Sequence, residues 1–256
     1  MALVPLSFGA AGNPPLILIH DISGSPFAYL PFASHLALSQ YTIYGLSALS
    51  PESPPAAVQG FEYPSVSAWA EAYAALIESE LKTELAADRR VVLGGWSLGG
   101  ILAAEIARIF ARRRSEKSVQ VLGLVLIDTY APWQPILRAG PRGLEGPGGA
   151  VVESAYFTPV ELIGIVNLLE HTERAAWPGM DGTRCSAWLI TPSVAAANGL
   201  EEWFDNNGAG RVRRIGQGRD GCDHFSMMDP GAGWIDEVIV VVSDALQSFN
   251  VMRVGE

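Results

Sequence analysis

The chain has little cysteine, few charged residues and no long hydrophobic run, and each shortage excludes a class of protein. Its two cysteines, Cys185 and Cys222, are too few for a disulfide framework, so we expect reduced thiols in an intracellular, cytoplasmic protein. No apolar run approaches the length of about 18 residues that a membrane-spanning helix needs. The N-terminus lacks the basic and apolar segments of a signal peptide. The four histidines are scattered without metal-ligand spacing, so we expect no metal and no other bound cofactor.

Charged residues account for 17% of the chain and hydrophobic residues for 49%, a balance typical of a packed rather than a disordered protein. The net charge of −10 argues against nucleic acid or an anionic membrane as the main partner, because both would repel the chain. A length of 256 residues suits one large domain with a substantial core, so we treat residues 1–256 as a single domain.

Short apolar runs alternate with longer helical patterns, which predicts an α/β fold with a mostly parallel central sheet flanked by helices. Strands are expected over residues 16–20, 42–46, 90–96, 121–128, 187–191 and 211–215. Helices are expected over residues 28–38, 67–85, 101–110 and 234–249. Residues 129–182 interrupt the alternation with a glycine- and proline-rich segment and an apolar helical pattern over 158–171. We expect a mobile helical lid there; an insertion packed against the body is the alternative.

The most informative motif is Gly95-x-Ser97-x-Gly99, which directly follows the apolar run 91–93 and precedes an amphipathic helical stretch. A serine at a tight strand-to-helix turn needs small neighbours, because the helix packs close against the sheet. It also gains the free N–H groups of the helix N-terminus, which stabilise developing negative charge. The motif predicts Ser97 as a catalytic nucleophile. A glycine-rich structural turn is the alternative, since a chain with 27 glycines produces chance matches.

A serine hydroxyl is a weak nucleophile at neutral pH and needs a histidine base that a third group orients. In α/β-hydrolases the three residues follow the chain order serine, acid, histidine. His171 and His224 come after Ser97, and His171 lies within the lid-like helical pattern. His224 lies in a small polar loop between the last expected strand and the final helix, so we predict it as the general base. A histidine in a surface loop is the alternative.

Asp128 is the predicted acid, because it closes an apolar strand, where a carboxylate needs a partner such as Nδ1 of His224. Asp223, which directly precedes the base, is expected to be a loop residue. The competing carboxylates occupy a helix-like stretch after the next strand: Glu201, Glu202 and Asp205.

Acyl transfer also needs N–H donors for the oxyanion. The backbone N–H of Leu98, directly after the nucleophile, is the first candidate. The second is expected from the loop of small residues after the first central strand, where we choose the N–H of Ile22 over that of Asp21. His20 in the same loop is expected to be structural and to hydrogen-bond the loop backbone.

With these residues in place, the chain resembles the thioesterase domains that terminate non-ribosomal peptide and polyketide synthases. The resemblance spans nearly the whole chain and rests on residues 16–24, 44–46, 94–100, 124–130 and 223–228. It implies an α/β-hydrolase fold with a helical lid over residues 129–182. It also implies that Ser97, Asp128 and His224 form a catalytic triad.

The resemblance further implies the reaction, in which Ser97 takes an acyl chain from the phosphopantetheine thioester of an acyl or peptidyl carrier protein domain. Water or an internal nucleophile then resolves the acyl-enzyme, by hydrolysis, cyclisation or condensation. The first loop, with Asp21 and Ser23, is closer to fungal members than to the more frequent proline- or glycine-rich form. Since no carrier domain precedes these residues, we expect an excised domain or a freestanding enzyme.

Three other functions fit the same pattern: an editing thioesterase, a small-molecule carboxylester hydrolase or lipase, and a catalytically silent binding module, which would normally have lost a triad member. An apolar lid implies an apolar or aromatic acyl chain. Carrier proteins are usually acidic, as this chain is, so docking requires a local basic surface. Residues 112–114 and the arginines of 211–214 are available, and cations at a helix end and on an edge strand are the alternative interpretation.

Overall fold

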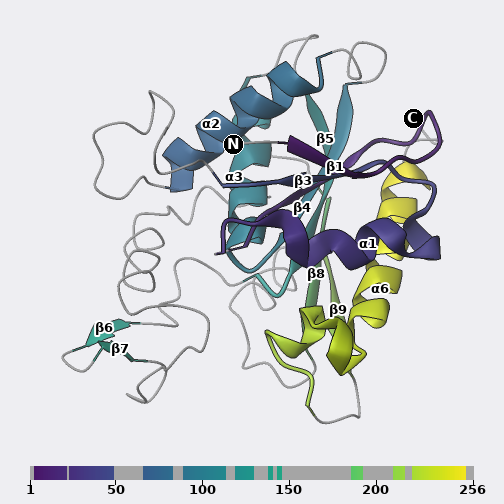
Figure 1. Cartoon of the computed structure of the whole chain (residues 1–256). Helices are drawn as coiled ribbons and strands as arrows, with labels where there is room; N and C mark the ends of the chain where they lie inside the picture. Colours follow the sequence, from purple (N-terminus) through teal and green to yellow (C-terminus); the bar gives the residue numbers. More distant parts are fainter. Residues whose placement is uncertain are drawn as a thin grey trace.

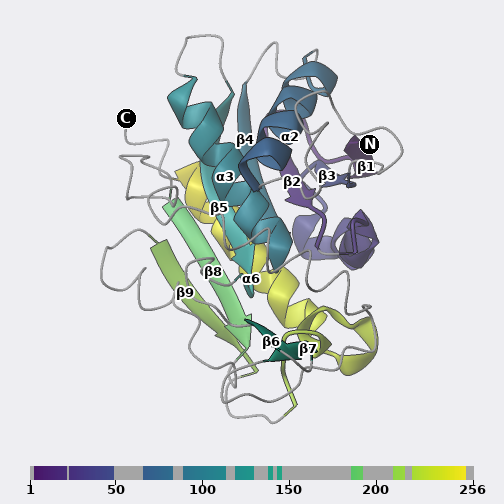
Figure 2. The same cartoon turned by 90° about the vertical axis from the view of Figure 1, so that its left-hand side faces the viewer.

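The structure, a computed structural model, describes residues 3–21, 23–48, 66–82, 89–113, 119–129, 138–140, 143–145, 186–192, 210–216 and 221–251. A central sheet lies between two layers of helices (Figures 1 and 2). α2 (Val66–Glu80) and α3 (Leu98–Arg112) cover one face. The short α1 (Leu30–Ser34) and the final helix α6 (Ile235–Val251) pack on the other. No helix among the described residues is long and apolar enough to cross a membrane.

The sheet has seven strands, in the spatial order β1 (Leu3–Ser7), β3 (Ile43–Leu46), β2 (Leu16–Ile19), β4 (Arg90–Trp96), β5 (Gln120–Ile127), β8 (Ser186–Pro192) and β9 (Gly210–Ile215). β1 is antiparallel to β3, and the other neighbouring pairs are parallel. The predicted mostly parallel sheet is therefore present. β1 was not predicted, because Pro5 interrupts its pattern, and an edge strand tolerates such a proline.

The central strands β2, β4, β5 and β8 are apolar along most of their length because helices cover both faces of the sheet. Alternate side chains of β4 enter opposite cores. Val91 and Leu93 pack in the cluster that contains α2 and α3, whereas Val92 and Trp96 pack in the cluster that contains α6. The buried central strands are therefore firm supports for the loops at their carboxyl ends, where open parallel sheets bind their ligands.

One predicted helix is wrong. Residues 28–38 form three short segments, η1 (Pro26–Tyr29), α1 and η2 (Leu36–Leu38), instead of a continuous helix. His35 interrupts them in an extended conformation, with φ −82° and ψ 132°. Its Nδ1 accepts a hydrogen bond from the N–H of Ala37 at 3.1 Å and so caps η2. A hydrophobic pattern does not reveal this side-chain cap, which competes with continuation of the helix.

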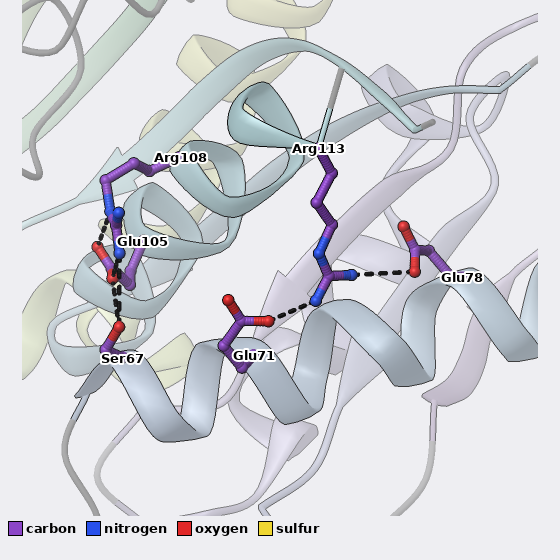
Figure 3. Close-up of polar contacts among 6 residues, drawn as sticks. All are labelled: Ser67, Glu71, Glu78, Glu105, Arg108 and Arg113. Atoms are coloured by element: carbon purple, nitrogen blue, oxygen red, sulfur yellow. Dashed lines mark hydrogen bonds and ion pairs between the residues drawn. The ribbon is translucent and has the colours of Figure 1, made fainter. Parts of the chain in front are cut away.

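A buried ion pair on α3 holds the first turn of α2 (Figure 3). Nε of Arg108 donates to Oε2 of Glu105 at 2.8 Å, and a second guanidinium nitrogen contacts Oε1. Oε1 also accepts a hydrogen bond from the hydroxyl of Ser67, on α2, at 2.9 Å. The two charged side chains are only 8% and 5% exposed, so each depends on the other to compensate its lost hydration.

Arg113, just beyond the end of α3, bridges Glu71 and Glu78 of α2 (Figure 3). Its Nη1 lies 3.0 Å from Oε2 of Glu78. The Arg113 charge is therefore paired within the domain, which fits the interpretation of residues 112–114 as cations at a helix end.

The insertion expected over residues 129–182 is described only at Thr129 and in the antiparallel pair β6 (Arg138–Gly140) and β7 (Gly143–Glu145). These two short strands lie in the glycine- and proline-rich part of the insertion, where no strand was predicted. The predicted helix over residues 158–171, with His171, lies outside the described residues, so the lid stays a prediction.

Candidate active site

Ser97 occupies the turn between β4 and α3. Its backbone has φ 57° and ψ −121°, a conformation that residues with a side chain rarely adopt. Its N–H donates to the carbonyl of Ile127 at 2.9 Å, so the pairing of β4 with β5 continues up to the serine. A strained turn of this kind presents the hydroxyl at the carboxyl edge of the sheet, beside the N-terminus of α3.

Three glycines make room for this turn. A Cβ on Gly95 would lie 2.4 Å from the backbone carbon of Gly99, and a Cβ on Gly99 would lie 2.3 Å from the carbonyl oxygen of Ile19. A Cβ on Gly100 would lie 1.8 Å from Oγ1 of Thr129. The close approach of α3 to the strands is therefore the physical reason for the small residues of the motif.

Asp128 directly follows β5 and is fully buried. Its Oδ1 accepts a hydrogen bond from the hydroxyl of Thr191 at 2.7 Å, and its Oδ2 lies 2.7 Å from Nδ1 of His224. Burying a carboxylate is costly unless hydrogen bonds compensate it, and both oxygens have a partner here. The structure thus brings together two of the three residues predicted for catalysis, although they are 96 positions apart.

Thr191 is a residue of this site that the sequence interpretation missed. Ile190 on β8 pairs with Ile127 on β5, so Thr191 lies opposite Asp128 at the same edge of the sheet. The sequence could have indicated Thr191, because it lies near the end of β8, the strand parallel to β5, and neighbouring parallel strands end at the same edge of a sheet.

His224 lies in the loop between β9 and α6, between two aromatic rings. The ring centroids of His224 and Trp96 are 5.0 Å apart, with planes at 34°, and Phe225 meets the imidazole edge-on at 5.0 Å. Trp96 directly precedes Ser97, so the ring contact places His224 beside the strained turn. The competing acids 201, 202 and 205 lie outside the described residues.

Asp223 shapes this loop. Its Oδ1 accepts hydrogen bonds from the N–H groups of Phe225 and Ser226, at 3.0 and 2.8 Å. The bond from the Ser226 backbone is the main reason that the pKa of the Asp223 carboxyl lies below its usual value. The carboxylate is engaged with its own turn, as expected of a loop residue.

His20 supports the loop that follows β2. Its Nδ1 lies 2.5 Å from the carbonyl oxygen of Asp21, which only accepts hydrogen bonds, so Nδ1 carries the proton. Nε2 then accepts from the hydroxyl of Tyr73, on α2, at 2.7 Å. Burial lowers the pKa of His20, which favours this neutral ring. The expected structural role of His20 is visible in these bonds, whereas Tyr73 was not foreseen.

Of the two predicted oxyanion donors, the structure describes Leu98 but not Ile22. Leu98 is the first residue of α3 and follows Ser97 directly. Ile22 lies outside the described residues. Beside it, Oδ1 of Asp21 accepts hydrogen bonds from the N–H and hydroxyl of Ser23, at 3.0 and 2.5 Å. Both donors stay predictions.

The arrangement suits nucleophilic catalysis by a serine, because a carboxylate-oriented imidazole lies beside a strained serine at a helix N-terminus. Among the described residues, no group of three or more histidine, cysteine or acidic side chains is arranged to hold a metal ion. Cys222 is buried, and Cys185 lies outside the described residues.

Comparison with known families agrees with this geometry. The model of the thioesterase domain matches residues 14–142, just over half of the chain. The chain belongs to the thioesterase domain family. The match includes Ser97 and Asp128, whereas His224 lies beyond it.

Three relatives illustrate the range of the family. A thioesterase from Fusarium pseudograminearum (strain CS3096) is 32% identical over 93% of this chain and 92% of its own length. Thioesterase frbD from Dothideomycetidae sp. (strain 11243) is 35% identical over 69% of this chain, which spans 62% of frbD. Atrochrysone carboxylic acid synthase PKS4 from Calonarius odorifer is 32% identical over 48% of this chain and only 6% of the synthase. The chain thus spans less than two thirds of frbD and a small part of the synthase.

Among solved structures, the RedJ thioesterase from the prodiginine biosynthetic pathway of Streptomyces coelicolor is similar, with a TM-score of 0.63. The likeness covers 95% of this chain and 96% of that one at 18% identity, so it concerns the fold alone. Together with the sheet order, it confirms the predicted α/β-hydrolase fold.

Proposed function

We propose that this domain releases an acyl chain from the phosphopantetheine thioester of a carrier protein, through an acyl-enzyme on Ser97. The observation that carries the proposal is the hydrogen bond between Nδ1 of His224 and Oδ2 of Asp128, beside the strained turn of Ser97. These three groups are the set that acyl transfer by a serine requires. Membership of the thioesterase family and the similarity to the synthase PKS4 support a thioester substrate carried by such a partner.

In acylation, Oγ of Ser97 attacks the thioester carbonyl carbon, and its proton passes to Nε2 of His224. Asp128 keeps the imidazole in the required orientation and stabilises the imidazolium that forms. The backbone N–H groups of Leu98 and Ile22 donate to the oxyanion in this proposal. The carbon–sulfur bond then breaks, the proton passes from Nε2 to the departing thiolate, and an ester remains on Ser97.

A second nucleophile releases the acyl chain. Water, or a hydroxyl, amine or carbanion of the chain itself, attacks the ester carbonyl while His224 again acts as base, and Ser97 is regenerated. Water gives hydrolysis, whereas an internal nucleophile gives cyclisation or condensation. The reaction needs no cofactor bound by the domain, and the expected apolar lid would limit access of water.

For docking of the carrier we propose the arginines of β9, at the edge of the sheet. The guanidinium groups of Arg211 and Arg213 lie 5.5 and 5.4 Å from the ring centroid of Trp188. Neither forms an ion pair with a carboxylate among the described residues, in contrast to Arg113. The double change Arg211→Glu and Arg213→Glu should weaken turnover of a carrier-linked thioester and spare a free pantetheine thioester. Equal losses on both substrates would contradict this docking site.

The experiment that tests the function records protein mass and thiol release. Wild-type and Ser97→Ala proteins are incubated with a panel of pantetheine thioesters of apolar and aromatic acids. The wild type should gain the mass of the acyl group and release thiol, and Ser97→Ala should do neither. A wild type that gains no acyl mass and releases no thiol with any member of the panel would contradict the proposal.

Three further readouts distinguish the alternatives. Simple aryl esters turned over far faster than any thioester would favour a small-molecule carboxylester hydrolase. Analysis of the released acids, lactones or lactams identifies the second nucleophile. Preferential removal of short, misloaded acyl groups from a carrier would favour an editing thioesterase.

A further inference from the structure

The hydroxyl of Tyr29 lies between the two strands that lead to the candidate site. It donates to the carbonyl of Ile19 at 2.7 Å and accepts a hydrogen bond from the N–H of Trp96 at 2.8 Å. Ile19 is the last residue of β2, and Trp96 is the last residue of β4. The predicted oxyanion loop continues from the first strand and Ser97 from the second. One side-chain atom therefore joins the backbones on both sides of the site.

This hydroxyl adds side-chain hydrogen bonds at the point where the pairing of β2 with β4 ends. β2 and β4 pair in register as far as Ile19 and Gly95. Beyond that point, the N–H of His20 donates to the carbonyl of Leu46 at the end of β3, and the N–H of Ser97 donates to the carbonyl of Ile127 at the end of β5. The pairing of β2 with β4 ends there, and the Ile19 carbonyl and the Trp96 N–H both contact the Tyr29 hydroxyl. A hydroxyl satisfies both, because it donates and accepts at once.

Tyr29 also closes the oxyanion loop at its base. It is the last residue of η1, whose start is capped by Ser25, which accepts a hydrogen bond from the N–H of Phe27 at 3.3 Å. The Tyr29 ring is fully buried and meets Phe32 edge-on at 5.8 Å. Burial raises the pKa of the Tyr29 hydroxyl far above its usual value, so its proton stays in place at any working pH.

We propose that Tyr29 is a positioning residue that sets the spacing between Ser97 and the oxyanion loop. This inference rests on the serine-dependent function proposed above. Oxyanion donors act only within about 2.7–3.1 Å of the developing charge. A displacement of about 1 Å at a distance from the chemistry is enough to cost about 100-fold in rate. Without the Tyr29 hydroxyl, the ends of β2 and β4 lose the two hydrogen bonds through which this side chain joins them.

The test removes the hydroxyl and keeps the ring. We expect Tyr29→Phe to lower kcat for an acyl-pantetheine thioester about 10- to 100-fold, while KM changes less than about threefold. Binding of the substrate persists, and only the alignment of the transition state is lost. The rate at which a fluorophosphonate labels Ser97 should fall by a similar factor, because that reaction uses the same nucleophile and oxyanion donors.

Tyr41→Phe is the matched control. Tyr41 is 1% exposed, belongs to the same core cluster, and its hydroxyl accepts a hydrogen bond from Asn250 at 3.5 Å. It lies near the start of β3, at the opposite end of the sheet from the site. Tyr41→Phe should therefore keep the wild-type kcat and labelling rate. All three proteins are compared well below their unfolding temperatures, so that unfolded protein does not contribute.

The inference is overturned if Tyr29→Phe keeps the wild-type kcat and labelling rate, or if Tyr41→Phe loses as much as Tyr29→Phe. Labelling also separates this inference from the proposed function. If no thioester is turned over but the probe labels Ser97 and labels Tyr29→Phe more slowly, the thioesterase proposal fails and the positioning role stands. If the wild type neither turns over a thioester nor reacts with the probe, both fail.

Discussion

The hydroxyl of Thr191 donates to Oδ1 of Asp128 at 2.7 Å, while Oδ2 of the same carboxylate faces Nδ1 of His224. The two oxygens therefore have separate partners, one on the neighbouring strand and one in the loop before α6. A carboxylate held at both oxygens does not rotate freely, so the orientation of the imidazole depends on Thr191 as well as on Asp128.

Thr191→Val should lower kcat/KM about 10-fold, because it keeps the volume of the side chain and removes the hydroxyl that orients Asp128. Thr191→Ser keeps the hydroxyl and should recover most of the activity. Steady-state kinetics on one acyl-pantetheine thioester measures both variants. Equal activities of the valine and serine variants would show that the hydroxyl has no orienting role.

Asp128→Asn should cost roughly 10³- to 10⁴-fold in kcat, because an amide neither stabilises the imidazolium nor selects the correct ring tautomer. Glu202→Gln is the comparison, since Glu202 is one of the competing acids, and it should cost little. Single-turnover acylation of Ser97 followed by intact mass measures the step directly. A larger loss for Glu202→Gln than for Asp128→Asn would reassign the acid.

The buried, neutral His20 should make the fold sensitive to acid. Burial lowers its pKa below the ordinary value of 6.5. As the pH falls below about 6.5, the unfolded chain binds a proton that the folded protein resists, so the free energy of unfolding decreases. His20→Gln removes this linkage. Its Tm should be lower at about pH 7 but should fall less than that of the wild type toward about pH 5. Scanning calorimetry at both pH values checks this, and parallel decreases would contradict it.

The buried Glu105–Arg108 pair and the partly exposed ion pairs of Arg113 should differ in their contribution to the free energy of unfolding. Glu105→Ala removes the carboxylate that pairs with the buried Arg108 guanidinium and should cost about 3–5 kcal/mol of unfolding free energy. Arg113→Ala breaks bonds between side chains that are a third or more exposed and should cost less than about 1 kcal/mol.

The double change Glu105→Leu and Arg108→Met is the control for that pair. It removes both charges together and should cost less than Glu105→Ala alone, because no buried charge then loses its counter-charge. Urea unfolding of the four proteins gives the comparison. A similar cost for Glu105→Ala and Arg113→Ala would mean that burial does not control the strength of these pairs.

Much of the fold could be predicted because its determinants are local. The apolar runs that form β2, β4 and β5 are continuous in the sequence, and both faces of each strand are buried over most of its length. The strand, serine and helix of the Ser97 turn also follow one another within a few residues. Prediction failed where a side chain overrides a pattern, as His35 does when it caps η2. It also failed for β1, whose proline is tolerated only because the strand lies at an edge.

The sequence by itself determined the order of the elements and the chemistry available at their ends, because periodicity and turn residues act over a few positions. Only the tertiary structure decided which of these groups meet. His224 and Asp128 are 96 positions apart, Thr191 and Asp128 are 63 apart, and Tyr29 and Trp96 are 67 apart. Such contacts arise when buried strands align in register and their ends converge on one edge. Hydrogen bonds of about 3 Å then depend on packing across the whole sheet, which no local pattern encodes.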